Sequence, residues 1–188
     1  SVVTMMQSFF YLTQQAQSYN LIFAASAEEE VSGRNGMESL LEELPPIDLA
    51  IVGEPTGMHA AVAEKGLMVL DCVTHGKAGH AARNEGDNAI YRAMEDIQWF
   101  KSFEFPEQTP FLGPVKMTVT QIAAGTQHNV VPDKCSFVVD VRSNELYTND
   151  QVLEIVRRHV QSDVTARSTR LGSTKSPLDH HKKKKAKA

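Results

Sequence analysis

Apolar residues in the first third of the chain occur in two patterns, helical spacing and continuous runs. Residues 2–17 place apolar side chains three or four positions apart, which predicts an amphipathic helix. Leu21–Ala27 and Ile47–Val52 are unbroken apolar runs, typical of strands that are covered on both faces. Between them, Met37–Leu44 predicts a short helix that stops at a pair of prolines. Alternating helices and strands predict part of an α/β domain over residues 1–58.

The pattern changes after Thr56 to segments in which apolar and polar residues alternate. We expect a strand around Met68–Cys72, a helix from Asp87 to about Phe103, strands over Val115–Ile122 and Cys135–Arg142, a helix over Asn149–Val160 and a strand over Ala166–Leu171. This βαββαβ order is that of the ferredoxin-like fold. We therefore expect a domain over 59–171 that is inserted into the larger α/β domain, which returns in residues 172–188.

The first helix of the inserted domain has a predicted cap and a predicted buried stripe. Asp87 is placed to cap its N-terminus. Ile90, Ala93, Met94 and Ile97 recur at helical spacing, which predicts that they face the core.

Composition narrows the classes of protein to which the chain can belong. The 188 residues carry a net charge of −4, which gives no general attraction for nucleic acid or for a membrane surface. We interpret the basic stretch 180–188 as a solvated charge run. Cys72 and Cys135 lie in strand-like segments without a metal or redox motif, so we expect buried core residues and a cytoplasmic protein. The chain begins at Ser1 without a Met, and we expect it to be a piece of a longer protein.

Carboxylates follow both apolar runs of the first segment. Glu28, Glu29 and Glu30 come after the first run, and Glu54 comes after the second. Ligands of parallel sheets bind beyond the carboxyl ends of the strands, and carboxylates gathered there repel one another unless a cation lies between them. A divalent metal such as zinc, with one carboxylate left as a general base, fits this pattern. A solvated acidic loop is the alternative.

Five segments in this order, "SAEEEVSG", "VGEPT", "GKAGHAARNEGDNAI", "GTQHNVVPDKC" and "VDVRS", resemble the two-zinc amidohydrolase and peptidase family. This family includes acetylornithine deacetylase, succinyl-diaminopimelate desuccinylase and glutamate carboxypeptidase. Acetylornithine deacetylase, an enzyme of arginine biosynthesis, is the branch that the segments resemble most. The resemblance implies a zinc-peptidase-like α/β catalytic domain with an inserted dimerisation (lid) domain. It also implies zinc-dependent hydrolysis of the amide bond of an N-acyl amino acid, such as N-acetylornithine, by a homodimer.

The resemblance assigns roles to residues of the acidic segments and of the glycine-rich loop. Glu29 matches the general base and Glu30 a zinc ligand, with Glu28 where the family usually has Asp. Glu54 matches a carboxylate ligand of the other zinc. The resemblance also implies that Co²⁺ can replace the zinc ions. His80 matches a histidine that reaches into the partner's active site and donates to the developing oxyanion. This chain has Arg83-Asn84 where the family often has a proline, so the loop's geometry stays open.

Two further residues match substrate-binding positions. Arg142 matches an arginine that binds a substrate carboxylate, which suits its planar fork of donors. The strand pattern places Arg142 and Asp140 on one face, so a surface ion pair between them is the alternative. Asn129 matches a residue that helps to bind the substrate, and an ordinary turn asparagine is the alternative.

The family's His-x-Asp motif, bridging Asp and C-terminal His have no counterparts in these residues. We therefore expect an incomplete ligand set and no activity from this chain alone. One alternative function is a non-catalytic dimerisation or substrate-binding module. Another is a desuccinylase or dipeptidase of the same family.

Overall fold

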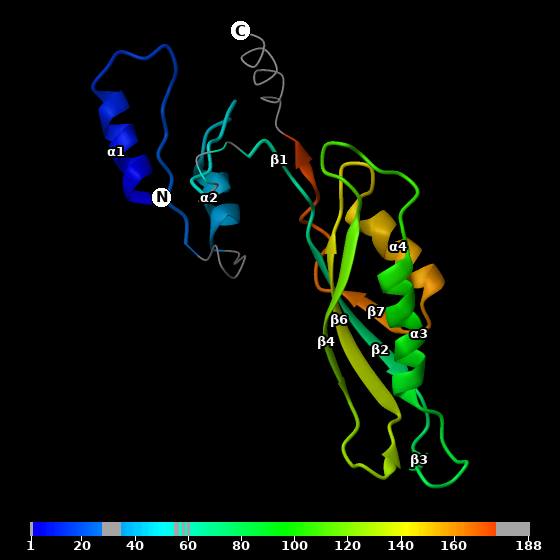
Figure 1. Cartoon of the computed structure of the whole chain (residues 1–188). Coiled ribbons are helices and arrows are strands. Elements are labelled where there is room, and N and C mark those ends of the chain that lie inside the picture. The colour runs from blue at the N-terminus through cyan, green and yellow to red at the C-terminus, as the bar shows by residue number, and fades with distance from the viewer. Residues whose placement is uncertain (1, 28–34, 55–56, 58, 60, 176–188) are drawn as a thin grey trace. The chain divides into compact units, whose positions relative to one another are not determined.

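In the computed structural model the chain forms two compact units, residues 1–60 and 61–188 (Figure 1). The structure describes residues 2–27, 35–54, 57, 59 and 61–175. Among these, every member of the buried hydrophobic cluster belongs to the second unit. No helix in this part of the chain is long and apolar enough to cross a membrane.

The first unit contains the predicted helices without the predicted strands. Its helices are α1 (Val2–Thr13), which is shorter than predicted, and α2 (Met37–Glu43). Leu21–Ala27 and Ile47–Val52 are not strands, contrary to the prediction from sequence. A strand needs a neighbour for its backbone N–H and C=O groups, and neither run has a ladder partner among the described residues. Their apolar side chains remain accessible, and that of Ile51 is 76% exposed.

The second unit contains a four-stranded antiparallel sheet in the order β4-β6-β2-β7. Its main elements are β2 (Met68–His75), α3 (Ala89–Ser102), β4 (Lys116–Ala124), β6 (Lys134–Arg142), α4 (Asn149–His159) and β7 (Asp163–Ala166). Two short pairs are added by β1 (Ala63–Glu64) with β8 (Thr174–Lys175), and by β3 (Gly79–His80) with β5 (Val130–Val131). This order and connectivity confirm the ferredoxin-like fold. The last strand lies at 163–166 rather than at 166–171.

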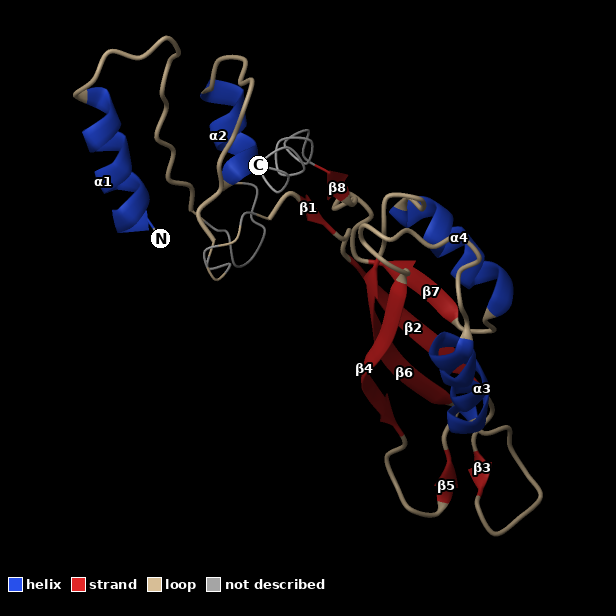
Figure 2. Ribbon diagram, turned by 45° about the horizontal axis from the view of Figure 1, so that its top comes forward, coloured by secondary structure: helices blue, strands red, loops and turns tan. Residues whose placement is uncertain are grey.

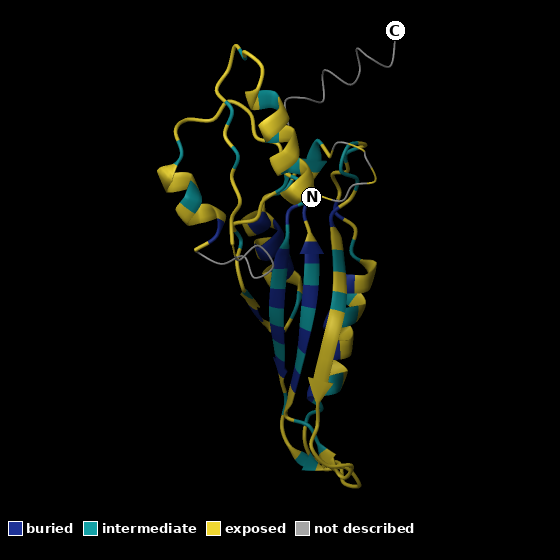
Figure 3. Ribbon diagram, turned by 90° about the vertical axis from the view of Figure 1, so that its left-hand side faces the viewer, coloured by how far each residue is buried: buried dark blue, intermediate teal, exposed yellow. Residues whose placement is uncertain are grey.

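Both helices cover the same face of the sheet, and this face carries the core (Figure 2). Side chains along β2 and β6 alternate between buried and partly buried, as the period of a strand requires (Figure 3). Leu70 and Cys72 on β2 pack with Phe137 and Val139 on β6, beneath residues of the two helices such as Val152. Neither Cys72 nor Cys135 is in a disulfide, and both are buried, which confirms their expected place in the core.

Helix α3 differs from the prediction at its start and on one flank. Asn88, not Asp87, caps the helix, and its side-chain oxygen accepts from the backbone N–H of Ile90 at 2.9 Å. Asp87 pairs instead with Arg92. Met94 is 57% exposed, because the buried stripe is narrower than the apolar pattern and leaves this flank of the helix accessible.

Candidate functional site

The predicted metal-binding carboxylates do not form a site within the described residues. Glu28, Glu29 and Glu30 lie outside the part of the chain that the structure describes. Glu54 lies within it and is exposed. No group of three or more His, Cys, Asp or Glu side chains suited to a metal ion occurs among the described residues. The described residues alone therefore form no zinc site, and Glu54 is the one predicted ligand among them.

The structure brings His80 and Asn129 together at one end of the sheet, which we call the tip (residues 76–88 and 125–133). In the tip, β3 and β5 pair, with Gly79 opposite Val131 and His80 opposite Val130 (Figure 2). The N–H of Ala81 donates to the carbonyl of Asn129 at 2.9 Å. Two residues that are distant in the sequence are thus neighbours in one exposed structure.

The His80 ring is oriented by its own loop. The N–H of Ala82 donates to Nδ1 of His80 at 3.2 Å, so Nδ1 accepts and the hydrogen of the neutral ring resides on Nε2. The side chain is exposed. Nε2–H is therefore available as a hydrogen-bond donor to a ligand, which is the chemistry expected of a donor to an oxyanion.

Close backbone packing shapes the loop that carries His80. Lys77 and Asp87 exchange two backbone hydrogen bonds of 2.8 Å, which close the loop at its base. A Cβ at Gly79 would lie 2.6 Å from the carbonyl oxygen of Glu85, so only glycine fits there. The turn at Arg83, where the family often has a proline, is closed by its N–H, which donates to the carbonyl of His80 at 2.9 Å.

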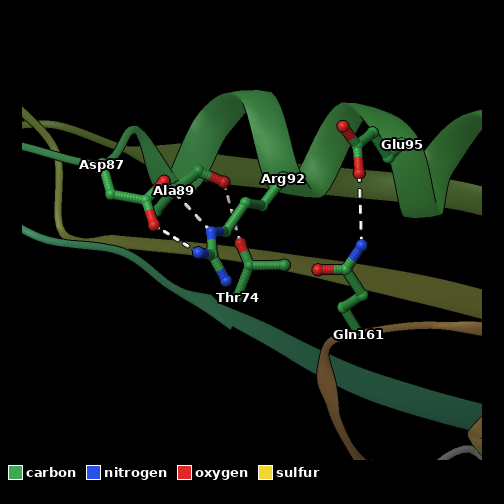
Figure 4. A network of polar contacts seen from close by, with 6 residues as sticks. All are labelled: Thr74, Asp87, Ala89, Arg92, Glu95 and Gln161. Carbon is green, nitrogen blue, oxygen red and sulfur yellow. Dashed lines mark hydrogen bonds and ion pairs between the residues drawn. The ribbon is translucent and has the colours of Figure 1, made fainter.

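Side chains brace this loop against the sheet and α3 (Figure 4). Arg92 donates to both carboxylate oxygens of Asp87, with Nε at 3.1 Å from Oδ1. The Thr74 hydroxyl donates to the carbonyl of Ala89 at 2.9 Å. The Asp87 pair joins the base of the His80 loop to α3, and the Thr74 bond joins the start of α3 to β2.

Arg142 lies at the opposite end of the sheet from the tip. It ends β6, where it faces Lys116 of β4. Its Nε and Nη2 donate to the two carboxylate oxygens of Asp140 at 2.8 and 3.1 Å, so the alternative ion pair does form. Hydrogen bonding to Asp140 raises the pKa of Arg142 above its usual value. An arginine has five N–H groups, and Asp140 takes two of them.

The two ends are far apart. Strand β6 runs from Lys134, beside the tip, to Arg142, and eight steps of about 3.3 Å each give a separation of roughly 26 Å. His80 and Asn129 lie still further along the same direction. Within a single unit, therefore, Arg142 cannot contact the same small molecule as His80.

Sequence reasoning missed two polar residues next to the Arg142 end, Ser143 and Asn149. Both are buried, and the Ser143 hydroxyl donates to Oδ1 of Asn149 at 2.7 Å. Serine after a strand and asparagine in the first turn of a helix are common surface choices. No local sequence signal distinguishes these two from exposed turn residues.

Comparison with known proteins identifies the second unit. Residues 62–166 match the peptidase dimerisation domain of the M20 family. The chain is 27% identical over 153 residues to succinyl-diaminopimelate desuccinylase 2 of Ruegeria sp. (strain TM1040), covering 76% of this chain and 39% of that protein. It is 25% identical over 178 residues to succinyl-diaminopimelate desuccinylase of Orientia tsutsugamushi (strain Ikeda), covering 88% and 46%.

Among solved structures, a Bacillus subtilis protein described as a dinuclear metal-binding peptidase of the M20 family is similar, with a TM-score of 0.41 and 18% identity. That match covers 59% of this chain and 28% of the other. The chain spans less than half the length of the curated relatives it matches. The match over most of the ferredoxin-like unit shows that this chain belongs to the M20 peptidase family and carries its dimerisation domain.

Proposed function

We propose that this chain is part of a metal-dependent hydrolase that cleaves the amide bond of an N-acyl amino acid, and that the second unit joins two copies into a homodimer. Family membership supports a hydrolase. The curated relatives reported above are desuccinylases, which favours an N-succinyl diamino acid as the substrate. They give no support to the N-acetylornithine branch that the sequence segments suggested.

The observation that carries this proposal is the separation of the tip from Arg142. Residues suited to one substrate lie at opposite ends of a sheet that is roughly 26 Å long. A second copy of the unit can bring these residues together if its tip lies beside the Arg142 end of the first copy. Each active site is then shared, with Arg142 from one subunit and His80 with Asn129 from the other.

The edge strand β4 offers a surface for such a dimer. It ends the sheet, and it runs from Lys116, beside Arg142, to Ala124, toward the tip. Antiparallel pairing of two β4 strands about a two-fold axis would bring each tip to the partner's Arg142 end. Beside this edge, Ile122 on β4 is 56% exposed and Met94 on α3 is 57% exposed. Apolar side chains along an open edge are typical of a surface that another chain covers.

Met94 lies about 140° around α3 from Trp99, because five residues of about 100° each separate them. Trp99 stacks on His159 of α4 with ring centroids 5.1 Å apart. The α4 side of the unit is therefore already packed within one copy. We therefore propose the β4 edge and the Met94 flank as the pairing surface, with β7 as the other open edge of the sheet.

The residues to which the family resemblance assigns roles act differently in the proposed reaction. Glu29 takes a proton from the attacking water and returns it to the leaving amine. The remaining N–H groups of Arg142 bind the substrate carboxylate, and Asn129 contacts the substrate from the partner tip. Nε2–H of His80 donates to the amide oxygen as negative charge develops on it. Glu30 and Glu54 would contribute to holding zinc, which lowers the pKa of a bound water, together with ligands from sequence beyond this chain.

Subunit complementation tests the shared site in the longer protein that contains this chain. His80→Ala and Arg142→Ala are each expected to lose hydrolysis of N-succinyl-diaminopimelate. After subunit exchange at equal amounts, random pairing leaves about a quarter of the sites intact, so about a quarter of the activity should return. Mixtures that stay inactive, although mixed dimers form, would contradict the shared site.

A non-catalytic dimerisation or substrate-binding module is the second candidate, because the part of the chain that matches the family model is its dimerisation domain. Elemental analysis after dialysis separates the two. Metal bound to the longer protein and not to this chain supports the hydrolase. No metal in either favours the non-catalytic module.

A further inference from the structure

A single buried amide joins three segments at the Arg142 end of the second unit. Asn149 is 2% exposed. The two hydrogens of its Nδ2 are shared among the carbonyls of Leu67, Thr169 and Leu171, at 3.3, 3.1 and 2.9 Å. Its Oδ1 accepts from the Ser143 hydroxyl at 2.7 Å. Three carbonyl groups around one atom can only accept, which fixes the orientation of the amide.

These bonds connect the segment that enters the unit, the segment that leaves it and the end of β6. The entering segment (61–67) includes β1, and the leaving segment (167–175) includes β8. The backbone reinforces the connection, since the N–H of Gly66 donates to the carbonyl of Ser143 at 3.0 Å and that of Leu67 donates to the carbonyl of Leu171 at 2.8 Å. A Cβ at Gly66 would lie 2.2 Å from the Ser143 hydroxyl oxygen, so the three segments pack without room for a side chain.

We propose that Asn149 is a positioning residue, which holds the Arg142 end of β6 in fixed register with both connecting segments. Arg142 directly precedes Ser143, so the backbone that aims the guanidinium is the backbone that Asn149 and Gly66 hold. Without the Asn149 amide, the carbonyls of Leu67 and Thr169 lose a donor and the connecting segments open more often. This inference rests on the proposed role of Arg142 in binding substrate.

Hydrogen exchange in the 188-residue chain tests the connection itself, independently of any activity. The matched control is Asn144→Ala, because Asn144 is also buried but bonds elsewhere, donating to the carbonyl of Gly113 at 2.9 Å and accepting from the N–H of Leu146 at 3.0 Å. In Asn149→Ala, we expect the amides of Gly66 and Leu67 to exchange about tenfold faster or more, while the β2–β6 ladder stays protected. The control should leave both amides as in the parent chain. Equal exchange of Gly66 and Leu67 in all three proteins would overturn the proposal.

Kinetics of the longer protein test the effect on Arg142. Asn149→Ala should raise KM about tenfold and leave kcat nearly unchanged. In the double variant with Arg142→Lys, KM should rise by less than the product of the two single-variant increases. Ser143→Ala, which removes only the bond from β6 to Asn149, is the gentler variant and should shift KM in the same direction. If Arg142→Lys raises KM but Asn149→Ala and Ser143→Ala leave it unchanged, the positioning role is overturned. If Arg142→Lys leaves KM unchanged, Arg142 does not bind the substrate, and the positioning role of Asn149 fails as well. The hydrogen-exchange result still decides, on its own, whether Asn149 holds the segments together.

Discussion

Arg142 donates from Nε and Nη2 to the two carboxylate oxygens of Asp140, at 2.8 and 3.1 Å. This pair holds the plane of the guanidinium and leaves its Nη1 side for a second carboxylate. A lysine ammonium cannot reproduce a planar fork that is shared by two carboxylates. We expect Arg142→Lys to raise KM for a carboxylate-bearing substrate by about tenfold or more, with a smaller change in kcat, in steady-state kinetics of the longer protein.

The matched control for this variant is Arg167→Lys. Arg167 forms the same kind of pair with Asp71, with distances of 2.9 and 2.8 Å, and the sequence assigns it no substrate role. Its KM should stay close to that of the parent. An equal rise in KM for both variants would show that the effect comes from the sheet surface rather than from substrate binding.

Glu29→Gln tests the proposed general base. The amide keeps the size of the side chain and removes its ability to take a proton, so turnover should fall by at least about 10². Metal content, measured by elemental analysis, should stay as in the parent. Glu42→Gln, an exposed residue of α2, makes the same chemical change and should leave turnover unaltered. Near-normal turnover in Glu29→Gln would remove the role assigned to Glu29.

The β4 edge can be tested in this chain by sedimentation. A lysine on an edge strand opposes pairing with another strand, so Ile122→Lys should shift the chain from dimer to monomer. Thr165→Lys, on the other edge strand β7, places the same charge at an exposed position and should leave the dimer intact. If Thr165→Lys dissociates the dimer and Ile122→Lys does not, the two copies pair through the wrong edge for the shared site.

The buried thiols should report unfolding of the second unit. Burial, with smaller contributions from Asp96 and Asp71, raises the pKa of Cys72 to about 12. At pH 8 the thiol is therefore protonated as well as covered, and only the thiolate is reactive. We expect no labelling of Cys72 in the native chain over a period in which an added Thr165→Cys, at an exposed position of β7 and away from the proposed β4 pairing edge, reacts fully, as measured by mass spectrometry. Comparable labelling rates at the two sites would mean that the core opens readily.

The Asp71–Arg167 pair predicts a pH dependence of stability. Hydrogen bonding to Arg167 lowers the pKa of Asp71 below its usual value of 3.8. A carboxyl with a depressed folded-state pKa stabilises the native state above its unfolded pKa, and this stabilisation is lost as the pH falls below 3.8. In urea unfolding, Asp71→Asn should be less stable than the parent at pH 7, and the difference should shrink in acid. Arg167→Gln should give the same pH profile, and a difference that is independent of pH would contradict the ionic origin.

The second unit could be predicted because its pattern is local. Alternation of apolar and polar residues along Cys135–Arg142 identifies the buried face of this strand without knowledge of its neighbours. The burial pattern of β6 confirms that face. Leu21–Ala27 has an equally clear apolar pattern, yet a strand exists only through its partners, and none pairs with it in the described residues. The meeting of His80 with Asn129 depends on contacts between distant segments, which periodicity does not encode. The same is true of the contacts of Asn149.

Strands β1 and β8 pair with Ala63 opposite Lys175, so the chain enters and leaves the second unit at adjacent points. Paired residues in an antiparallel ladder lie about 5 Å apart, which a short surface loop of an unrelated host can span. We therefore expect residues 61–175 to form a transplantable module, because the buried cluster lies entirely within them. A host that received this module in a loop would gain an edge strand for self-association, and its own fold would need no rearrangement.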